Sequence, residues 1–240
     1  MKRIFLIFIL LIGTLTGQAQ FWKTKISGNG HIVTEERKIA HFDKLTVTGP
    51  FKVKIIEGKS PVIKLTTDEN LINIIDTYVK SGKLIIRINP DFSIKKYTKL
   101  KMVVPSQYLS KITLTGSGSV YNEKPFDWHN LSLTLTGSGD IDLISQVNHI
   151  EVVITGSGSV QLQGSSDRLK ASITGSGELL AKDLAAKDAK VTITGSGEAY
   201  VQCSTHLTAK VFGSGNLYYF GEPQFLKTKV FGSGAIHLHQ

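Results

Sequence analysis

The sequence predicts an all-β protein: a single-stack parallel β-helix, or β-solenoid, of about 19-residue coils with Gly-Ser-Gly corners, plus one short amphipathic helix in the N-terminal half. Two observations predict this fold. The triplet Gly-Ser-Gly recurs seven times in the 240-residue chain, at spacings of 18 to 21 residues. Apolar and polar residues alternate on both sides of each triplet, which is typical of strands with one buried face. A propeller blade would need about 40 or more residues per repeat.

The glycines of the triplets are predicted to form the corners at which the chain turns from one strand to the next. A sharp corner repeated in register needs positive φ or close backbone approach, and glycine tolerates both. The serines between the glycines are expected to align in a hydroxyl ladder. The predicted structural turn glycines are Gly116, Gly118, Gly137, Gly139, Gly156, Gly158, Gly175, Gly177, Gly195, Gly197, Gly213, Gly215, Gly232 and Gly234.

The aliphatic positions of the repeats predict the core. The residue two before the first glycine is aliphatic in every repeat, from Leu114 to Val230, and so is the residue four after it, from Val120 to Ile236. One coil cannot bury its apolar face alone, but coils stacked about 4.8 Å apart align each position into a column. The columns are expected to form one continuous aliphatic interior.

Residues 1–19 have the layout of a secretory signal peptide. Lys2 and Arg3 precede an apolar run, 4–12, and a segment of small residues that ends at Ala19, where cleavage is expected. The apolar run is too short to cross a bilayer, which takes about 20 residues, and no later stretch is apolar enough to span one. The sequence therefore predicts an exported protein of the periplasm, outer cell surface or extracellular space, with no transmembrane span after cleavage.

Residues 20–108 repeat the coil pattern less regularly. The segment 42–56 is a degenerate coil in which Pro50 stands in place of the corner serine. Near residues 68–80 the apolar positions take a helical period and follow a capping box, with Ser81 and Gly82 as the stop signal. This amphipathic helix is expected to lie against the solenoid, over the open N-terminal strand edge.

Residues 109–240 are predicted to form the regular solenoid, continuous with the preceding part. Leu238 lies two residues from the last residue of the sequence, and no polar cap over the final coil is evident. An uncovered strand edge invites pairing with another chain, so a homo-oligomer through the terminal coil is expected.

Charge and cysteine content limit the classes of partner. The formal net charge is +9, or +7 without Lys2 and Arg3, and the basic residues are dispersed among acids along the sequence. This charge permits weak attraction to acidic polysaccharide or an anionic surface, whereas a nucleic-acid partner would need a basic stripe with interleaved aromatic residues. Cys203 is the single cysteine, which excludes an internal disulfide and favours a small buried residue.

The sequence offers no catalytic, cofactor-binding or metal site. Calcium-binding solenoids place an aspartate after the turn in successive coils, but only three of the seven repeats carry an acid there. His237 and His239 share an outward face without a third ligand. Asp140 and Asp142 also share a face, and a solvated strand explains them better than catalysis. A polysaccharide-acting β-helix enzyme that uses these aspartates is the alternative.

Hydroxyl side chains are expected to form two columns on one outward strand face. Such an array resembles the faces of ice-binding solenoids, so ice or crystal-surface binding is a further alternative. The high strand propensity of threonine explains the same pattern without a ligand. The residues of this speculative surface are Thr113, Thr115, Thr134, Thr136, Thr192 and Thr194, together with Ser172 and Thr174.

Three features together resemble a known family. They are the opening TEERKIAHFDKLTVTGPFKVKIIEG, the segment DENLINIIDTYVKSGKLIIRI and the Gly-Ser-Gly array. The chain resembles the putative auto-transporter adhesin head GIN domain family of bacterial secreted proteins over nearly its whole mature length. The resemblance implies a β-solenoid with an adhesion role at the cell surface, and it brings no ligand or catalytic residue.

Export, repeat architecture and the absence of a recognisable active site favour one functional class. We expect a non-enzymatic interaction module of the cell envelope or surface. Its ladder of strands would present a rigid face to a glycan or to an envelope or surface protein.

Overall fold

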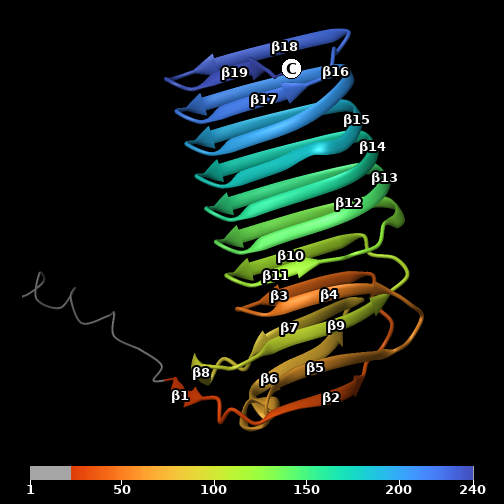
Figure 1. The fold of residues 1–240 in the computed structure, drawn as a ribbon, viewed down its shortest axis with the longest axis vertical. Coiled ribbons are helices and arrows are strands. Elements are labelled where there is room, and N and C mark those ends of the chain that lie inside the picture. The colour runs from red at the N-terminus through yellow and green to blue at the C-terminus, as the bar shows by residue number, and fades with distance from the viewer. Residues whose placement is uncertain (1–22, 240) are drawn as a thin grey trace, which may run out of the picture.

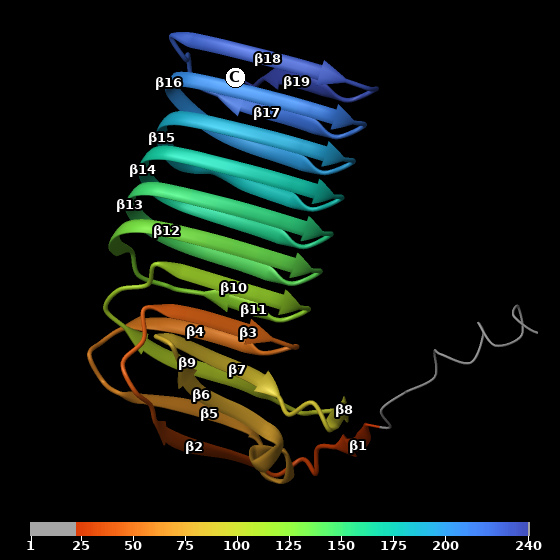
Figure 2. The same ribbon diagram turned by 180° about the vertical axis from the view of Figure 1, so that it is seen from behind.

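The computed structural model describes residues 23–239, and the predicted signal peptide, 1–19, lies outside them. The described chain is mostly strand and winds into a solenoid whose coils stack along the long axis of the molecule (Figure 1 and Figure 2). The predicted all-β solenoid with a repeat near 19 residues is confirmed. Among residues 23–239, no helix is both long and apolar enough to cross a bilayer.

The strands of the N-terminal part are β1 (Thr24–Ser27), β2 (Ile32–Lys38), β3 (Lys44–Thr48), β4 (Lys52–Glu57), β5 (Val62–Asp68), β6 (Ile75–Lys80), β7 (Lys83–Ile88), β8 (Phe92–Lys96) and β9 (Leu100–Ser106). The strands of the regular array are β10 (Lys111–Gly116), β11 (Ser119–Tyr121), β12 (Phe126–Gly137), β13 (Asp140–Gly156), β14 (Ser159–Gly175), β15 (Glu178–Gly195), β16 (Glu198–Gly213), β17 (Asn216–Phe220), β18 (Phe225–Phe231) and β19 (Ala235–Leu238).

In the regular array, equivalent residues of neighbouring coils lie side by side in parallel register. Gly137 pairs with Gly156, which in turn pairs with Gly175, and the aliphatic positions pair in the same way. Ile154 and Ile173 are fully buried, as are most of their counterparts. Each of β13 to β16 runs from one corner to the next, so one strand contributes to both faces of the solenoid.

The corners bring the backbones of successive coils into contact. Gly156 has a φ of +115°, and a Cβ built on it would lie 2.5 Å from the carbonyl oxygen of Gly137. The N–H of Ser157 donates to that same oxygen at 2.9 Å. The hydroxyls of the corner serines are exposed, and the ladder along the corner is one of backbone hydrogen bonds rather than of hydroxyls. A side chain at Gly156 would therefore collide with the coil below.

The N-terminal part departs from a purely parallel solenoid. Strands β3 and β4 pair in parallel with β10 and β11, so the coil at 44–57 lies directly beneath the regular array. The chain between β4 and β10 folds back below this coil as β5, β6, β7 and β9. There the pairs β2–β5, β5–β9 and β6–β7 are antiparallel.

The amphipathic helix predicted near 68–80 is wrong. The chain forms a 3-10 helix, η1 (Glu69–Ile74), followed by strand β6. Ser81 and Gly82 have φ values of 52° and 72°, so they form the two-residue turn of a β-hairpin rather than a helix stop. Of the apolar residues that match a helical face, Leu71, Ile74 and Ile75 are buried by η1 and the start of β6, whereas Tyr78 is exposed on β6.

Buried and half-buried charges close the N-terminal end of the solenoid. Arg37 points inward from the edge strand β2, and its guanidinium donates to the carbonyl oxygens of Ile72 and Ile75 at 2.8 and 2.6 Å. Asp68 is fully buried and accepts from the backbone N–H groups of Gly30 and Thr98, each at 2.8 Å. Inward-pointing charges and a covering segment are known protections of a sheet edge.

The substitution Gly156→Ala is expected to lower the free energy of unfolding by about 3 kcal/mol, because it adds a Cβ at positive φ and against a backbone oxygen. Denaturant unfolding measures the loss. The exposed neighbour Ser157→Ala is the matched control, with a change of about 0.5 kcal/mol or less. Equal effects of the two substitutions would refute the contact between coils.

Asp68→Asn is expected to destabilise the N-terminal part by about 1–3 kcal/mol, because the neutral amide leaves a buried donor without its carboxylate. Burial alone would raise the pKa of Asp68, but hydrogen bonds from Thr98 and Gly30 hold it below its ordinary value of 3.8. The carboxylate therefore stabilises the fold above about pH 4, and this contribution is lost as the pH falls. Urea unfolding between pH 3 and 7 should show an acid-dependent loss of stability that is smaller in D68N than in the parent chain.

Candidate functional site

The solenoid has two broad outer faces that differ in side chains. The threonine face is formed by the outward residues of the segment just before each Gly-Ser-Gly corner, such as 151–155 in β13. The variable face is formed by the outward residues of the segment just after each corner, such as 140–144 in β13. On the threonine face one column is continuous through six coils: Thr48, Thr115, Thr136, Thr155, Thr174 and Thr194.

The structure brings the predicted threonines together on this face. Thr113, Thr134 and Thr192 lie in a second column, which Val153 interrupts. Lys210 ends that column, and above the first column Phe212 and Phe231 stack at 5.1 Å between ring centroids. Thr46, Thr48 and Thr155 complete the array at equivalent positions of the repeat, although they are not among the residues predicted from the sequence.

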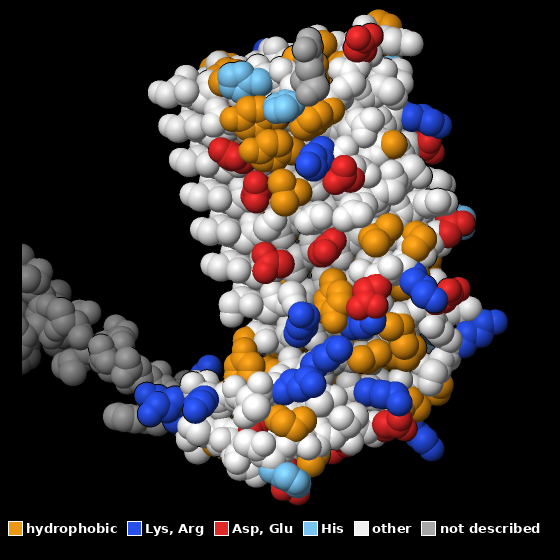
Figure 3. All heavy atoms as spheres, viewed as in Figure 1, with side chains coloured by type: hydrophobic (Ala, Val, Ile, Leu, Met, Phe, Trp, Pro, Cys, Tyr) orange, Lys and Arg blue, Asp and Glu red, His pale blue; other side chains and the backbone are white. Residues whose placement is uncertain are grey.

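The variable face changes character from coil to coil. Figure 3 shows lysines over the N-terminal coils, carboxylates over the middle and hydrophobic and histidine side chains towards the terminal coil. One column runs through Lys52, Ser119, Asp140, Ser159, Glu178, Glu198, Asn216 and Ala235. Because the interior is the same in every coil, these outward residues are what distinguishes one coil from another.

The carboxylates of the variable face lie apart from one another, except that Glu178 and Glu198 are neighbours in the column. Ser159 separates Asp140 from Glu178 in the column, and Asp140 and Asp142 are both exposed. Within residues 23–239, no group of three or more His, Cys, Asp or Glu side chains is placed to hold a metal ion. His237 instead stacks on Tyr218 at 5.2 Å between ring centroids, and the ring of His239 lies tilted against that of Phe220 at 4.9 Å.

Tyr200 begins the main aromatic column of this face. Its ring stacks on Tyr218 at 4.8 Å, and its hydroxyl donates to a carboxylate oxygen of Glu198 at 3.0 Å. This hydrogen bond, with burial and the negative charge of Glu198, raises the pKa of Tyr200 to about 12. Each ring covers the face of its neighbour, so the column is a structural stack with little ring face left for a ligand below the terminal coil.

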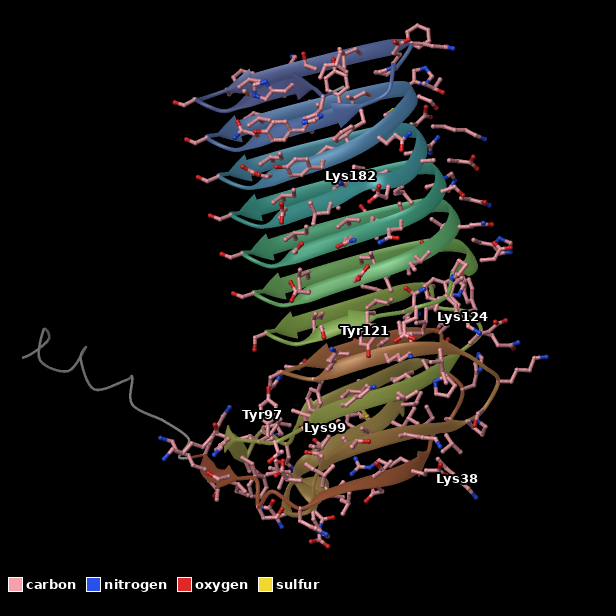
Figure 4. All side chains as sticks on the ribbon, in the orientation of Figure 1. Lys38, Tyr97, Lys99, Tyr121, Lys124 and Lys182 are labelled. Atoms are coloured by element: carbon pink, nitrogen blue, oxygen red, sulfur yellow. The ribbon has the colours of Figure 1, made fainter. Side chains whose placement is uncertain are left out.

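Five lysines gather at the N-terminal end of the variable face. We call Lys52, Lys54, Lys64, Lys99 and Lys101 the lysine patch. Lys52 pairs in register with Lys101, and Lys54 and Lys64 both flank Val103. Figure 4 shows Lys99 and Tyr121 projecting from this side of the solenoid.

Only part of the charge of the lysine patch is neutralised. Lys54 pairs with Glu123, and Lys64 pairs with Glu36 at 2.8 Å. Lys52 lies 5.4 Å from the centroid of the Tyr121 ring, and the described residues give Lys52, Lys99 and Lys101 no carboxylate partner within ion-pair distance. The patch therefore keeps an excess positive charge.

The charge of the whole chain has the same asymmetry. Residues 23–108 carry 16 basic and 8 acidic side chains, whereas residues 109–239 carry 10 and 11. The basic residues were expected to be dispersed among acids, but the fold gathers an excess of them in the N-terminal part. The signal that could have revealed the patch was this difference between the two parts of the chain.

Cys203 lies in the core, where burial raises the pKa of its thiol. Its sulfur contacts the carbonyl oxygens of Lys187 and His206 at 3.2 Å. The interpretation of Cys203 as a small buried residue agrees with this position, which is fully inaccessible to solvent.

Comparison with known proteins identifies relatives of the whole solenoid. Residues 41–223 match the family described as "Putative auto-transporter adhesin, head GIN domain". The solved structure of a "putative adhesin" from Bacteroides fragilis is 23% identical with a TM-score of 0.81, covering 88% of this chain and 98% of that one. A "putative adhesin" from Parabacteroides distasonis is also 23% identical, with a TM-score of 0.74 and coverage of 88% and 98%. At these identities the likeness shows the fold alone.

A further solved structure is more similar in sequence. A "Putative lipid binding protein" from Parabacteroides distasonis is 28% identical with a TM-score of 0.77, covering 90% of this chain and all of that one. No curated protein matches the chain.

Glu198→Gln is expected to bring the pKa of Tyr200 from about 12 back towards 10, because the amide carries no charge to hold the phenolic proton. Ultraviolet absorbance of the phenolate, followed against pH, measures the shift. Because the folded-state pKa is raised, the Tyr200 bond stabilises the fold below about pH 10, and this contribution is lost as the pH rises through 12. The control is Asp142→Asn on the same face, which should leave the titration unchanged, and an identical response of both variants would contradict the pairing.

Proposed function

Because this chain belongs to the family described as "Putative auto-transporter adhesin, head GIN domain", we propose that it is an exported, non-enzymatic interaction module of the cell surface or envelope. Its ligand is an acidic polysaccharide that binds along the variable face at the lysine patch. The observation that carries the proposal is the gathering of five lysines there, three of them without a carboxylate within ion-pair distance in the described part of the chain, although Glu123 also attracts Lys101.

The geometry of the lysine patch suits an extended polyanion. Its residues come from three neighbouring strands, β4, β9 and β5, with Lys99 immediately before β9, and adjacent strands lie about 4.8 Å apart. A flat, rigid array of cations on one face attracts an anionic polymer over a long range and so raises its local concentration at the face. Thr66 and Ser119 lie beside Lys101 and Lys52 and add hydroxyl groups that can hydrogen-bond to sugar.

Exposure of Asp140 and Asp142 favours binding over catalysis at these two residues. A glycosidase needs two carboxyl groups facing one bond, with one of them kept protonated by its surroundings. Asp140 and Asp142 lie on an open strand face, where water solvates both. A role in keeping this outer surface solvated therefore accounts for both aspartates, and no catalytic role is needed.

An anionic lipid surface is the alternative ligand of the lysine patch. The 28%-identical relative is described as a lipid binding protein, and an anionic membrane would be attracted to the same lysines. The solenoid interior is filled with side chains such as Leu114, Leu135 and Ile154, so we propose no enclosed lipid site. The exposed ring of Tyr97 lies two residues before Lys99. Polysaccharide is preferred because the patch is a flat strand face, whereas a stable membrane contact needs a continuous apolar face rather than isolated rings.

The double substitution K52E/K101E is expected to weaken binding to polygalacturonate or alginate by about tenfold or more, because it replaces two unpaired cations by anions. Binding to the immobilised polymers is measured at low and moderate salt, with neutral dextran as the polymer control. K190E/K210E, on the threonine face, makes the same change in net charge and should bind almost as well as the parent chain.

Three outcomes would overturn the proposal. They are equal losses in the two double variants, binding of dextran as strong as that of the acidic polymers, and binding that salt does not weaken. Selective binding to vesicles of anionic lipid, with no binding to the acidic polymers, would assign the patch to a membrane instead.

A further inference from the structure

The columns that run along the solenoid end at the terminal coil, formed by β18 and β19, where their last side chains have a neighbour on one side only. All residues of β18 are exposed, and Leu226 and Val230 keep 50% and 40% of their surface in contact with solvent. In the coil beneath, their counterparts Leu207 and Val211 are buried at 1% and 0% exposure. Among the described residues, β18 pairs with β16 only, so its outer edge has no ladder partner.

Aromatic stacks end at the same coil. Phe225 stacks on His206 at 4.7 Å, and Phe231 stacks on Phe212 at 5.1 Å with ring planes only 2° apart. Both phenylalanines are more than half exposed, so one ring face of each is open. The terminal coil therefore presents an open backbone edge, the ends of core columns and open ring faces on one surface.

The opposite end of the solenoid differs in chemistry: within residues 23–239 its edge strand β2 also pairs on one side only, but the end is polar and its interior is covered. There η1 covers the interior, and the inward guanidinium of Arg37 donates to the carbonyl oxygens of Ile72 and Ile75. A head-to-tail stack would have to place the apolar terminal coil against this polar end. Two terminal coils fit each other better than one fits the polar end.

The sequence of β18, Phe-Leu-Lys-Thr-Lys-Val-Phe, reads nearly the same in both directions around Thr228. We propose that the terminal coil binds a second copy of this chain through antiparallel pairing of the two β18 strands, with a twofold axis at Thr228. Such an interface is isologous: each residue meets its counterpart in a closed dimer, and no open filament forms. The proposal does not depend on the polysaccharide ligand.

Antiparallel pairing around Thr228 completes the unfinished columns. Leu226 lies opposite the partner's Val230, so both gain an apolar neighbour on the inner side. Phe225 lies opposite the partner's Phe231, so each ring stack continues across the axis into the other copy. The free N–H and C=O groups of the edge are hydrogen-bonded at the same time.

The lysines of β18 give the dimer a characteristic salt dependence. Lys227 lies opposite the partner's Lys229, and like charges directly opposite each other oppose pairing. Both side chains are exposed, so added salt screens the repulsion and strengthens the dimer. Salt has the reverse effect on polyanion binding at the lysine patch, so the two proposals fail separately.

Thr228→Cys tests the axis directly. Residues opposite each other in an antiparallel pair have Cα atoms about 4.5–5.5 Å apart, within the range that a disulfide bridges. Under oxidising conditions T228C should form a covalent dimer, seen on a gel without reductant. Thr192→Cys, outward on an interior coil, is the matched control and should stay monomeric, and the native Cys203 is buried.

Sedimentation velocity on the exported chain, residues 20–240, supplies the reversible measurement. We expect a monomer–dimer equilibrium that shifts to dimer with protein concentration and with salt. Val230→Glu should raise the dimer dissociation constant by about tenfold or more, because it places a charge in the apolar contact, and circular dichroism checks that the variant monomer stays folded. A strict monomer at all concentrations would overturn the proposal, as would growth into higher oligomers that T228C does not trap.

Discussion

Contact between the backbones of successive coils at the glycine corners is the constraint on which the rest of the structure depends. At Gly156 and its equivalents the chain turns with positive φ directly above a carbonyl oxygen of the coil below. This contact sets the coils in register, and register aligns like residues into columns. A corner shifted by one residue would reverse every following side chain between the interior and the surface.

Register explains why chemistry is confined to the outer faces. The interior positions repeat as Leu, Ile, Val and Ala because each column must fill the same narrow space in every coil. The outward positions carry no such demand, so a coil can hold lysine, carboxylate or tyrosine at one place, as Lys52, Asp140 and Glu198 do in a single column. Function can therefore change along the solenoid without a change of fold.

Local repetition made the array predictable, and long-range pairing hid the rest. The spacing of the triplets and the aliphatic positions around them were enough to predict the solenoid and its core. The segment 68–80 misled because Leu71, Ile74 and Ile75 fit a helical face, whereas antiparallel pairing with β7 determines its structure. The lysine patch was hidden for a similar reason: Lys52 and Lys101 are far apart in sequence and become neighbours only through the pairing of β4 with β9.

The two ends of the solenoid show how an edge can be either closed or used. A strand edge with apolar column ends is unstable in water, and the N-terminal end removes the problem with η1 and Arg37. At the terminal coil, covering a Leu or Val side chain contributes about 1.5–3 kcal/mol, whereas a like-charge pair across strands costs about 0.2–1 kcal/mol. The lysines of β18 are therefore too weak to keep the apolar edge apart, but their repulsion disfavours the many other pairings that an uncharged edge would allow. An edge of this composition favours one specific partner strand over general aggregation.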